Sequence, residues 1–238
     1  LSVELIKPFI DKEKIVLVGS KIRDRFITSA EKKFDSFLLV LGQSNYRQEQ
    51  IILDNWQEDY PKLIILCGRN LLKNRNITKK EQDNITYIEK YLIEEEYSKL
   101  LTEHGVHLCL SSASTYAHTF QDCLSAKSIP ICIDSFPYRY FVSNHINAYM
   151  VKSHKKKKLP NSFGSEYLFK TEEFKLVLEK VIKIMKEDEI LLEEMAEKNK
   201  KNIRQENMKY DRVFKEFFDK IWALYKKNKP LKERYEIY

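Results

Sequence analysis

One segment of this sequence groups small hydroxyl residues with a histidine and a carboxylate. It runs from Ser111 to His118, reads SSASTYAH, and is followed four residues later by Asp122. Hydroxyl groups and the free N–H groups of a helix N-terminus together bind phosphate or carboxylate groups. The same hydroxyl residues are also good helix caps. The segment by itself therefore leaves two interpretations open, an anion-binding loop and a plain helix cap.

Two further polar loops follow apolar runs that end in glycine. The first, residues 43–47 (QSNYR), contains Ser44 and Arg47, and the second is residues 69–70 (RN). An arginine just before a helix can hold a phosphate, although a surface turn with one exposed arginine has the same composition. The sequence has neither a G-x-G-x-x-G motif after a strand nor a G-x-x-x-x-G-K-[ST] motif. The common dinucleotide and P-loop sites are therefore excluded.

The elements that must position these loops alternate between apolar runs and helical patterns. Strands are predicted at residues 15–18, 37–41, 63–67, 85–88, 106–110 and 129–133, and helices at 48–60, 93–104 and 119–127. Continuous apolar runs are typical of strands covered on both faces. Their alternation with helices predicts an α/β fold, a Rossmann-like parallel sheet with helices on both faces. In such a fold the three polar loops lie at the carboxyl edge of the sheet, where ligands bind.

After Phe169 the pattern contains helices alone. One is predicted to begin near Thr171, and others cover roughly residues 187–204 and 211–227. We therefore expect residues 1–34 to form a linker and first strand and residues 35–169 to form the Rossmann-like domain. Residues 170–238 are expected to be a C-terminal helical extension of that domain.

The charge of the chain is +7 over 238 residues, from 42 basic and 35 acidic side chains. Such an excess suits nucleic acid, a membrane surface or an anionic small ligand. Part of it lies in the run Lys155–Lys158, which we predict to be an exposed loop outside the ligand site, because four adjacent lysines cannot be buried together. No basic stretch alternates with aromatic residues as in RNA-binding sheets, so nucleic acid is not the expected partner.

Apolar residues make up 43% of the chain and charged residues 32%, which predicts a globular protein with a core. No apolar run reaches the roughly 18 residues that span a bilayer, so the chain is not expected to be transmembrane. Four cysteines show no metal-ligand spacing: Cys67, Cys109, Cys123 and Cys132. We predict buried thiols, no metal site and a reducing, cytoplasmic setting.

Taken in order, these pieces resemble the C-terminal, donor nucleotide-sugar-binding domain of family-four GT-B glycosyltransferases. The segments that follow one another as they do in that family are residues 37–42, 61–68, 84–88, 94–101 and 107–130. The resemblance covers most of the chain, from about residue 15 to residue 225. It implies that the fold is half of a GT-B fold.

The resemblance implies a retaining enzyme that transfers a hexose from a nucleotide-diphosphate sugar to a glycan or protein acceptor, with no metal or other cofactor. The base would lie at Tyr87 and Ile88, the ribose at Asp122, and the diphosphate at Arg47 and the N–H groups that open the following helix. His118 would donate a hydrogen bond to a phosphate or sugar oxygen, and a structural role is equally open for it. The residues implied in donor binding are Ser44, Arg47, Tyr87, Ile88, Ser114, Thr115, Ala117 and Thr119, with His118 and Asp122 as catalytic residues.

The sequence departs from the family at several of these positions. Two glutamates eight residues apart are replaced by Ser114 and Asp122, and a later glutamate falls at Tyr140. The family's Gly-aromatic-Gly reads TYA at residues 115–117, and one of its two phosphate-binding cations falls at Gln43. An inactive binding or scaffolding domain is therefore the alternative function. A GT-B enzyme also needs an acceptor domain, for which 238 residues leave no room, so we expect an N-terminal acceptor domain or a separate partner protein.

Overall fold

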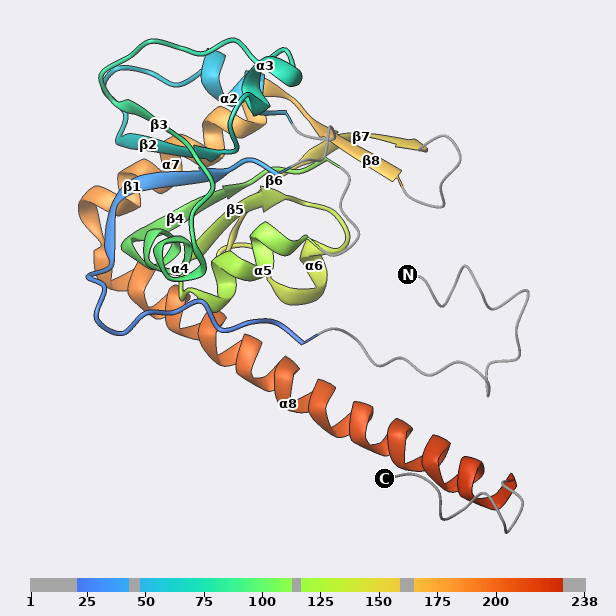
Figure 1. Cartoon of the computed structure of the whole chain (residues 1–238). Coiled ribbons are helices and arrows are strands. Elements are labelled where there is room, and N and C mark those ends of the chain that lie inside the picture. The colour runs from blue at the N-terminus through green and yellow to red at the C-terminus, as the bar shows by residue number, and fades with distance from the viewer. Residues whose placement is uncertain (1–20, 43–47, 113–116, 159–164, 229–238) are drawn as a thin grey trace. The chain divides into compact units, whose positions relative to one another are not determined.

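The computed structural model describes residues 21–42, 48–112, 117–158 and 165–228. At its centre lies a parallel sheet of six strands in the order β3-β2-β1-β4-β5-β6 (Figure 1). The strands are β1 (Lys33–Val40), β2 (Lys62–Cys67), β3 (Ile85–Glu89), β4 (His104–Cys109), β5 (Ile129–Ile133) and β6 (Tyr149–Val151). The predicted Rossmann-like fold class is confirmed. The strand predicted at residues 15–18 lies outside the described residues.

The two faces of the sheet carry different packing partners. On one face Leu38 and Ile64 pack with Leu101 of α4 (Glu94–Glu103) and Ala126, which follows α5 (His118–Ser125). On the other face, the ring of Phe37 meets Trp56 edge-on, with 5.2 Å between the ring centres. Figure 1 shows α4 and α5 over one face and α7 (Thr171–Glu187) behind the other. Helices on both faces explain why the strands read as continuous apolar runs.

Three short helices complete the loops: α2 (Glu49–Asp54), α3 (Leu71–Asn74) and α6 (Tyr138–Phe141). The helix predicted over residues 48–60 is thus only partly right, because α2 ends at Asp54. Trp56 lies beyond the end of the helix, where its indole N–H donates to the Pro61 carbonyl at 3.2 Å. It is fully buried because the loop, rather than a helical face, presents it to the sheet.

The last helix, α8, is a single element of 40 residues, Glu189–Asn228. The prediction of two helices was wrong, because residues 205–210 (QENMKY) contain no glycine or proline to end one. The chain forms two compact units, one of residues 23–203 and one of residues 1–22 with 204–238, and α8 contributes to both. Within the second unit, the Asn207 side chain binds the backbone N–H and carbonyl of Ile22, both at 2.7 Å.

The lysine run is a strand, not the predicted loop. β7 (Ser153–Lys158) pairs antiparallel with β8 (Ser165–Phe169), and Lys156 lies opposite Tyr167 in the register. A strand accepts this charged run because both faces of the two-stranded ribbon reach solvent: Lys156, Lys157 and Lys158 are exposed, as predicted. Backbone hydrogen bonds hold β7 and β8 together, whereas the sequence prediction identified strands by their apolar side chains.

All four cysteines are free and buried, as expected. Within the described ranges, no helix is both long and apolar enough to cross a membrane.

Candidate functional site

The candidate site begins where β4 ends and α5 starts. Cys109 closes β4, and its sulfur lies 3.9 Å from the carbonyl of Thr119, so the first turn of α5 stands beside the carboxyl end of the strand. The Ala117 carbonyl accepts the N–H groups of Phe120 at 3.0 Å and Gln121 at 2.9 Å, which closes that first turn. The predicted helix therefore exists at this edge. Ser114 and Thr115, within residues 113–116, lie outside the described residues.

Ala117 opens α5 in the left-handed conformation, with φ 50° and ψ 50°. A residue with a Cβ pays about 1–2 kcal/mol for this conformation, and glycine is the residue that adopts it routinely. The resembled family has glycine at this position. The turn of the backbone is thus of the glycine type although the residue is alanine. His118 is exposed, and Thr119 is half-buried.

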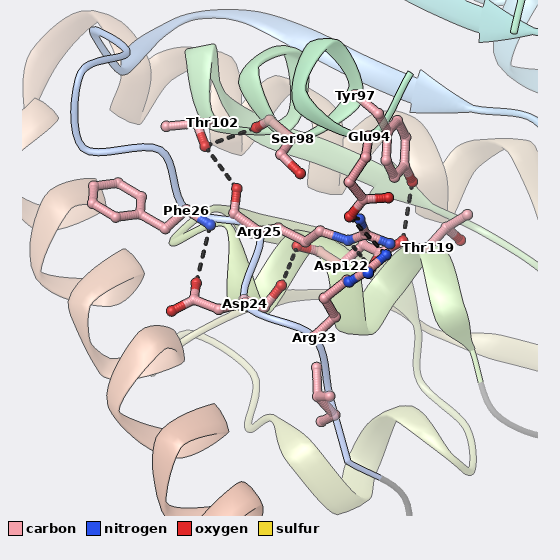
Figure 2. Close-up of polar contacts among 12 residues, drawn as sticks. Arg23, Asp24, Arg25, Phe26, Glu94, Tyr97, Ser98, Thr102, Thr119 and Asp122 are labelled. Carbon is pink, nitrogen blue, oxygen red and sulfur yellow. Dashed lines mark hydrogen bonds and ion pairs between the residues drawn. The ribbon is translucent and has the colours of Figure 1, made fainter. Parts of the chain in front are cut away.

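Asp122, one turn further along α5, is held by two side chains from other parts of the chain. Arg25 donates its Nε–H to Oδ1 at 2.8 Å, and the Tyr97 hydroxyl donates to Oδ2 at 3.0 Å (Figure 2). The side chains of Asp122 and Arg25 are only 15% and 13% exposed. The guanidinium carbon of Arg25 also lies 5.1 Å from the centre of the Tyr97 ring. We call Arg25, Tyr97 and Asp122 the Asp122 clamp.

Glu94, at the start of α4, extends the clamp towards solvent. It forms ion pairs with Arg25 and, at 2.9 Å, with Arg23. Burial opposes the charge of Arg25, but hydrogen bonding to Asp122 and the charges of Asp122 and Glu94 outweigh it and raise the pKa of Arg25. Burial, followed by the Asp122 carboxylate, raises the pKa of Tyr97 well above its usual range. Tyr97 is therefore a hydrogen-bond donor at every physiological pH.

The segment that carries Arg25 is fastened to α4 by its backbone (Figure 2). The N–H of Ile27 donates to the Thr102 hydroxyl at 3.1 Å, and that hydroxyl lies 3.2 Å from the carbonyl of Arg25 and 2.9 Å from that of Ser98. Sequence reasoning missed Arg25 and Tyr97. Arg25 lies 97 residues from Asp122, in a segment expected to be a linker, and no local pattern links the two.

Tyr87 and Ile88 are neighbours on β3 and so point to opposite faces of the sheet. Ile88 packs against the cluster that contains Leu101. Tyr87 lies on the other face, where the N–H of Lys80 donates to its hydroxyl at 3.0 Å and the ammonium of Lys79 lies 5.2 Å from its ring centre. On the face that carries Tyr87, a nucleotide base could therefore contact only the ring of Tyr87 or the edge of β3.

The predicted residues divide into two groups on one edge of the sheet. Ala117, His118, Thr119 and Asp122 share the start of α5, and β3 lies three strand positions from β4. Strands are about 4.8 Å apart, so the two groups are separated by roughly 14 Å. Only an extended ligand can touch both. Ser44 and Arg47, in the loop after β1, lie outside the described residues.

No cluster of three or more histidine, cysteine, aspartate or glutamate side chains within the described ranges could hold a metal ion. One histidine stands apart from the site. His107 is buried in β4, where its Nε2 lies 2.8 Å from the His104 carbonyl and 3.1 Å from that of Leu101. Burial, together with the charge of Lys32, lowers its pKa to about 3. It is a neutral core residue and not part of the edge.

Comparison with solved structures identifies the architecture. The chain is similar to the pneumococcal O-GlcNAc transferase GtfA, in complex with UDP and GlcNAc, with a TM-score of 0.64 and 13% identity over 92% of this chain and 42% of that one. A glycosyltransferase from Rickettsia africae matches with the same score and identity, over 92% of this chain and 61% of the other. The C-terminal domain of a glycosyl transferase group 1 family protein (LpcC) from Francisella tularensis matches with a TM-score of 0.51 and 12% identity. That match covers 79% of this chain and 97% of the Francisella domain.

The fold is half of a GT-B fold. The chain spans about two fifths of the length of GtfA, and nearly all of the isolated Francisella domain falls within it. No protein-family model matches the sequence, and no curated protein matches it. At these sequence identities, the structural similarity establishes the GT-B half-fold only. The activity has to be argued from the residues of the site.

Proposed function

We propose that this chain is the donor-binding half of a GT-B glycosyltransferase, and that it holds a nucleotide-diphosphate sugar along the carboxyl edge of its sheet. The observation that carries the proposal is the start of α5. Ala117, in the left-handed conformation, immediately precedes α5, and the first turn of that helix lies beside the carboxyl end of β4. A helix N-terminus in this position binds a diphosphate through its N–H groups and dipole.

The other contacts follow from the resemblance to family-four enzymes. The diphosphate takes the N–H groups of Ala117 to Thr119 and the side chain of His118, with Arg47 from the loop after β1. Ser44, Ser114 and Thr115 supply hydroxyl groups around it. The ribose binds Asp122. The base lies at β3, against the ring of Tyr87 or the backbone edge of the strand at Ile88. A nucleoside diphosphate is long enough to bridge the roughly 14 Å between β3 and β4.

Asp122 can serve the ribose and the clamp together. A carboxylate accepts about four hydrogen bonds, and Arg25 and Tyr97 supply one to each oxygen. One further position on each oxygen remains for a ribose hydroxyl. Only 15% of the side chain is exposed, so any ligand must approach through that narrow opening.

Catalysis at such a site consists mainly of stabilising the negative charge that develops on the leaving diphosphate. The N-terminus of α5, Arg47 and His118 supply that stabilisation without a metal. The acceptor half of the enzyme comes either from an N-terminal domain of the same protein or from a separate chain, and the acceptor is a glycan or a protein.

The alternative function is an inactive binding or scaffolding domain that keeps the fold. Two observations favour it: both oxygens of Asp122 already have protein partners, and Tyr140, where the family has a glutamate, is 55% exposed in α6. Under this alternative the Asp122 clamp is structural, and the domain transfers no sugar.

Isothermal titration of the full chain with UDP, GDP, ADP and UDP-GlcNAc tests the proposal. We expect one nucleotide to bind, and Arg47→Ala to weaken that binding about 10- to 150-fold, the equivalent of one charge-assisted contact of about 1.5–3 kcal/mol. Arg212→Ala, an exposed arginine on α8, is the matched control and should leave the affinity unchanged. Absence of heat with every nucleotide would favour the scaffolding function. Donor hydrolysis then separates an active site from one that only binds.

A further inference from the structure

The β7–β8 hairpin is attached to the same segment that opens α5. The N–H of Tyr167 donates to the Ser112 carbonyl at 2.7 Å, and the Ser112 hydroxyl donates to Oε1 of Glu166 at 2.9 Å. Ser112 is itself buried and lies between the end of β4 and the start of α5. The hairpin therefore stands beside the candidate donor site, at the carboxyl edge of the sheet (Figure 1).

The base of the hairpin is fixed rather than loosely attached. The Ser153 hydroxyl donates to the Asp134 carbonyl at 3.2 Å, just after β5. Phe169, at the other strand's end, is buried, and its ring lies 5.8 Å from that of Phe174 in α7. Anchors at both strands hold the ribbon in one position relative to the sheet, so its charges are presented at a defined place.

The charge of the ribbon is not neutralised by the described protein. β7 carries four consecutive lysines, whereas the one carboxylate on the two strands, Glu166, binds Ser112. Across the described part of the chain, Lys156, Lys157 and Lys158 form no ion pair, although exposed lysines on helices do, such as Lys99 with Glu103 and Lys183 with Glu187. Adjacent like charges on a strand repel one another, and a polyanion relieves that repulsion.

The register divides the lysines between the two sides of the ribbon. Lys157 lies opposite Glu166 and shares its side, which faces Ser112, and Lys156 lies over the Tyr167 ring on the other side, 5.8 Å from its centre. Ser112 contacts Tyr167 and Glu166, which lie opposite Lys156 and Lys157, so the middle of the lysine run is beside the segment that opens α5. A chain that binds along these lysines would therefore pass beside the donor site.

The cations also indicate what kind of polyanion fits. They are all lysines, compact point charges that lack the planar fork of arginine and so respond to the density of negative charge more than to the shape of one anionic group. Sites for single-stranded nucleic acid combine cations with a row of accessible aromatic rings. On the described strands, Phe169 is buried at the base and the ring of Tyr167 is already covered by Lys156, so no such row is present. Phosphate or sulfate esters on a sugar chain meet both conditions.

We propose that the β7–β8 hairpin binds an anionic acceptor glycan, one that carries phosphate or sulfate esters, and guides it to the donor site. The proposal rests on the donor-binding function for its purpose and on the hairpin's own geometry for its site. The hairpin lysines would then act on the acceptor and not on the nucleotide.

The experiment compares the full chain with a Lys156→Ser, Lys157→Ser, Lys158→Ser variant. The probe is a fluorescein-labelled heparin dodecasaccharide, titrated at several salt concentrations, with neutral dextran, polyglutamate and oligo-dT as competitors. The matched control removes three exposed lysines from α7 and α8: Lys183, Lys186 and Lys201. Melting temperatures verify folding, and a single charge reversal, Lys157→Glu, provides a second variant if the triple one is unstable.

We expect the hairpin variant to lose at least tenfold in affinity at low salt, with a flatter dependence on salt by about one unit per lost contact. The control should keep most of its affinity, and UDP titration of the hairpin variant should match the parent chain. Equal losses in both variants, or competition by oligo-dT or polyglutamate as strong as by unlabelled heparin, would overturn the proposal. So would a loss of nucleotide binding in the hairpin variant. If no nucleotide binds to the parent while the hairpin-dependent glycan binding persists, the donor function fails and the glycan site stands.

Discussion

Removal of the Asp122 carboxylate should measure how far the clamp holds the domain together. Asp122→Ala eliminates the acceptor of two hydrogen bonds, at 2.8 Å from Arg25 and 3.0 Å from Tyr97. Each charge-assisted bond contributes about 1.5–3 kcal/mol. Arg25 keeps Glu94 as a partner, so its charge is not left alone. We therefore expect the free energy of unfolding to fall by about 2–4 kcal/mol, somewhat less than the roughly 3–5 kcal/mol of a fully buried pair that loses one partner.

Urea unfolding at neutral pH provides the measurement, with midpoint and slope recorded for each variant. Tyr97→Phe removes only the hydroxyl and should cost about 1–2 kcal/mol. The double variant should cost less than the sum of the two single changes, because both act on the same carboxylate. The control is Lys99→Ala, which breaks a pair with Glu103 on the same helix. Those side chains are 60% and 38% exposed, so a change within about 0.5 kcal/mol is expected.

The result that would refute this reasoning is an Asp122→Ala variant as stable as the Lys99→Ala control. It would mean that the bonds to Arg25 and Tyr97 contribute nothing net. Nucleotide affinity gives a separate reading on the same variants. Asp122→Asn should weaken nucleotide binding if the ribose uses the carboxylate, whereas Tyr97→Phe should leave the affinity nearly unchanged.

Three further predictions concern stability. Burial keeps His107 neutral in the folded protein, whereas in the unfolded chain this side chain is protonated below about pH 6.5. The free energy of unfolding should therefore fall as the pH is lowered from 6.5 towards 3, by up to about 1.4 kcal/mol per pH unit, and His107→Gln should remove this contribution of His107 in acid titrations. Ala117→Gly should cost about 1–2 kcal/mol less than Ala126→Gly in urea, because only Ala117 has a positive φ; equal costs would contradict the left-handed turn. Gly105→Ala should lower stability by about 1–3 kcal/mol, because the added Cβ would lie 2.3 Å from the ring of the buried Phe34. Gly68→Ala meets only the exposed end of the Tyr91 side chain and should change thermal unfolding little.

The sheet could be predicted because its strands are buried on both faces. The runs at β1, β2 and β5 contain five or more apolar residues in a row or nearly so, which in a sequence rich in lysine and glutamate marks them clearly. β6 was missed because it contains only three residues, Tyr149–Val151, too short for any periodicity. β7 was missed because its stability comes from backbone pairing with β8 and from its anchors, while its side chains read as a solvated loop.

Only the part of the candidate site that is contiguous in the sequence could be predicted. The start of α5 was found because strand, hydroxyl-rich loop and helix are adjacent in sequence. Arg25 and Tyr97 were not, because they reach Asp122 from 97 and 25 residues away. Contacts between residues so far apart in the sequence depend on tertiary packing, such as that of α4 beside α5. The spacing of residues in a single sequence does not reveal that packing. The Ser112–Glu166 bond, across 54 residues, was missed for the same reason.

The clamp gives the segment around Arg25 a direct effect on the site. In the resembled family, residues 14–34 correspond to the linker that leaves the acceptor domain. Here residues 25–27 of that segment are hydrogen-bonded to Thr102 of α4, and the Arg25 side chain holds the carboxylate that the resemblance assigns to the ribose. A carboxylate fixed by two outer partners presents its remaining lone pairs in set directions, as supporting hydrogen bonds do in other preorganised sites. Under the proposed function, a displacement of residues 25–27 would change the hydrogen bond from Arg25 to Asp122, so the position of this segment and the affinity for the ribose would be coupled through one guanidinium group.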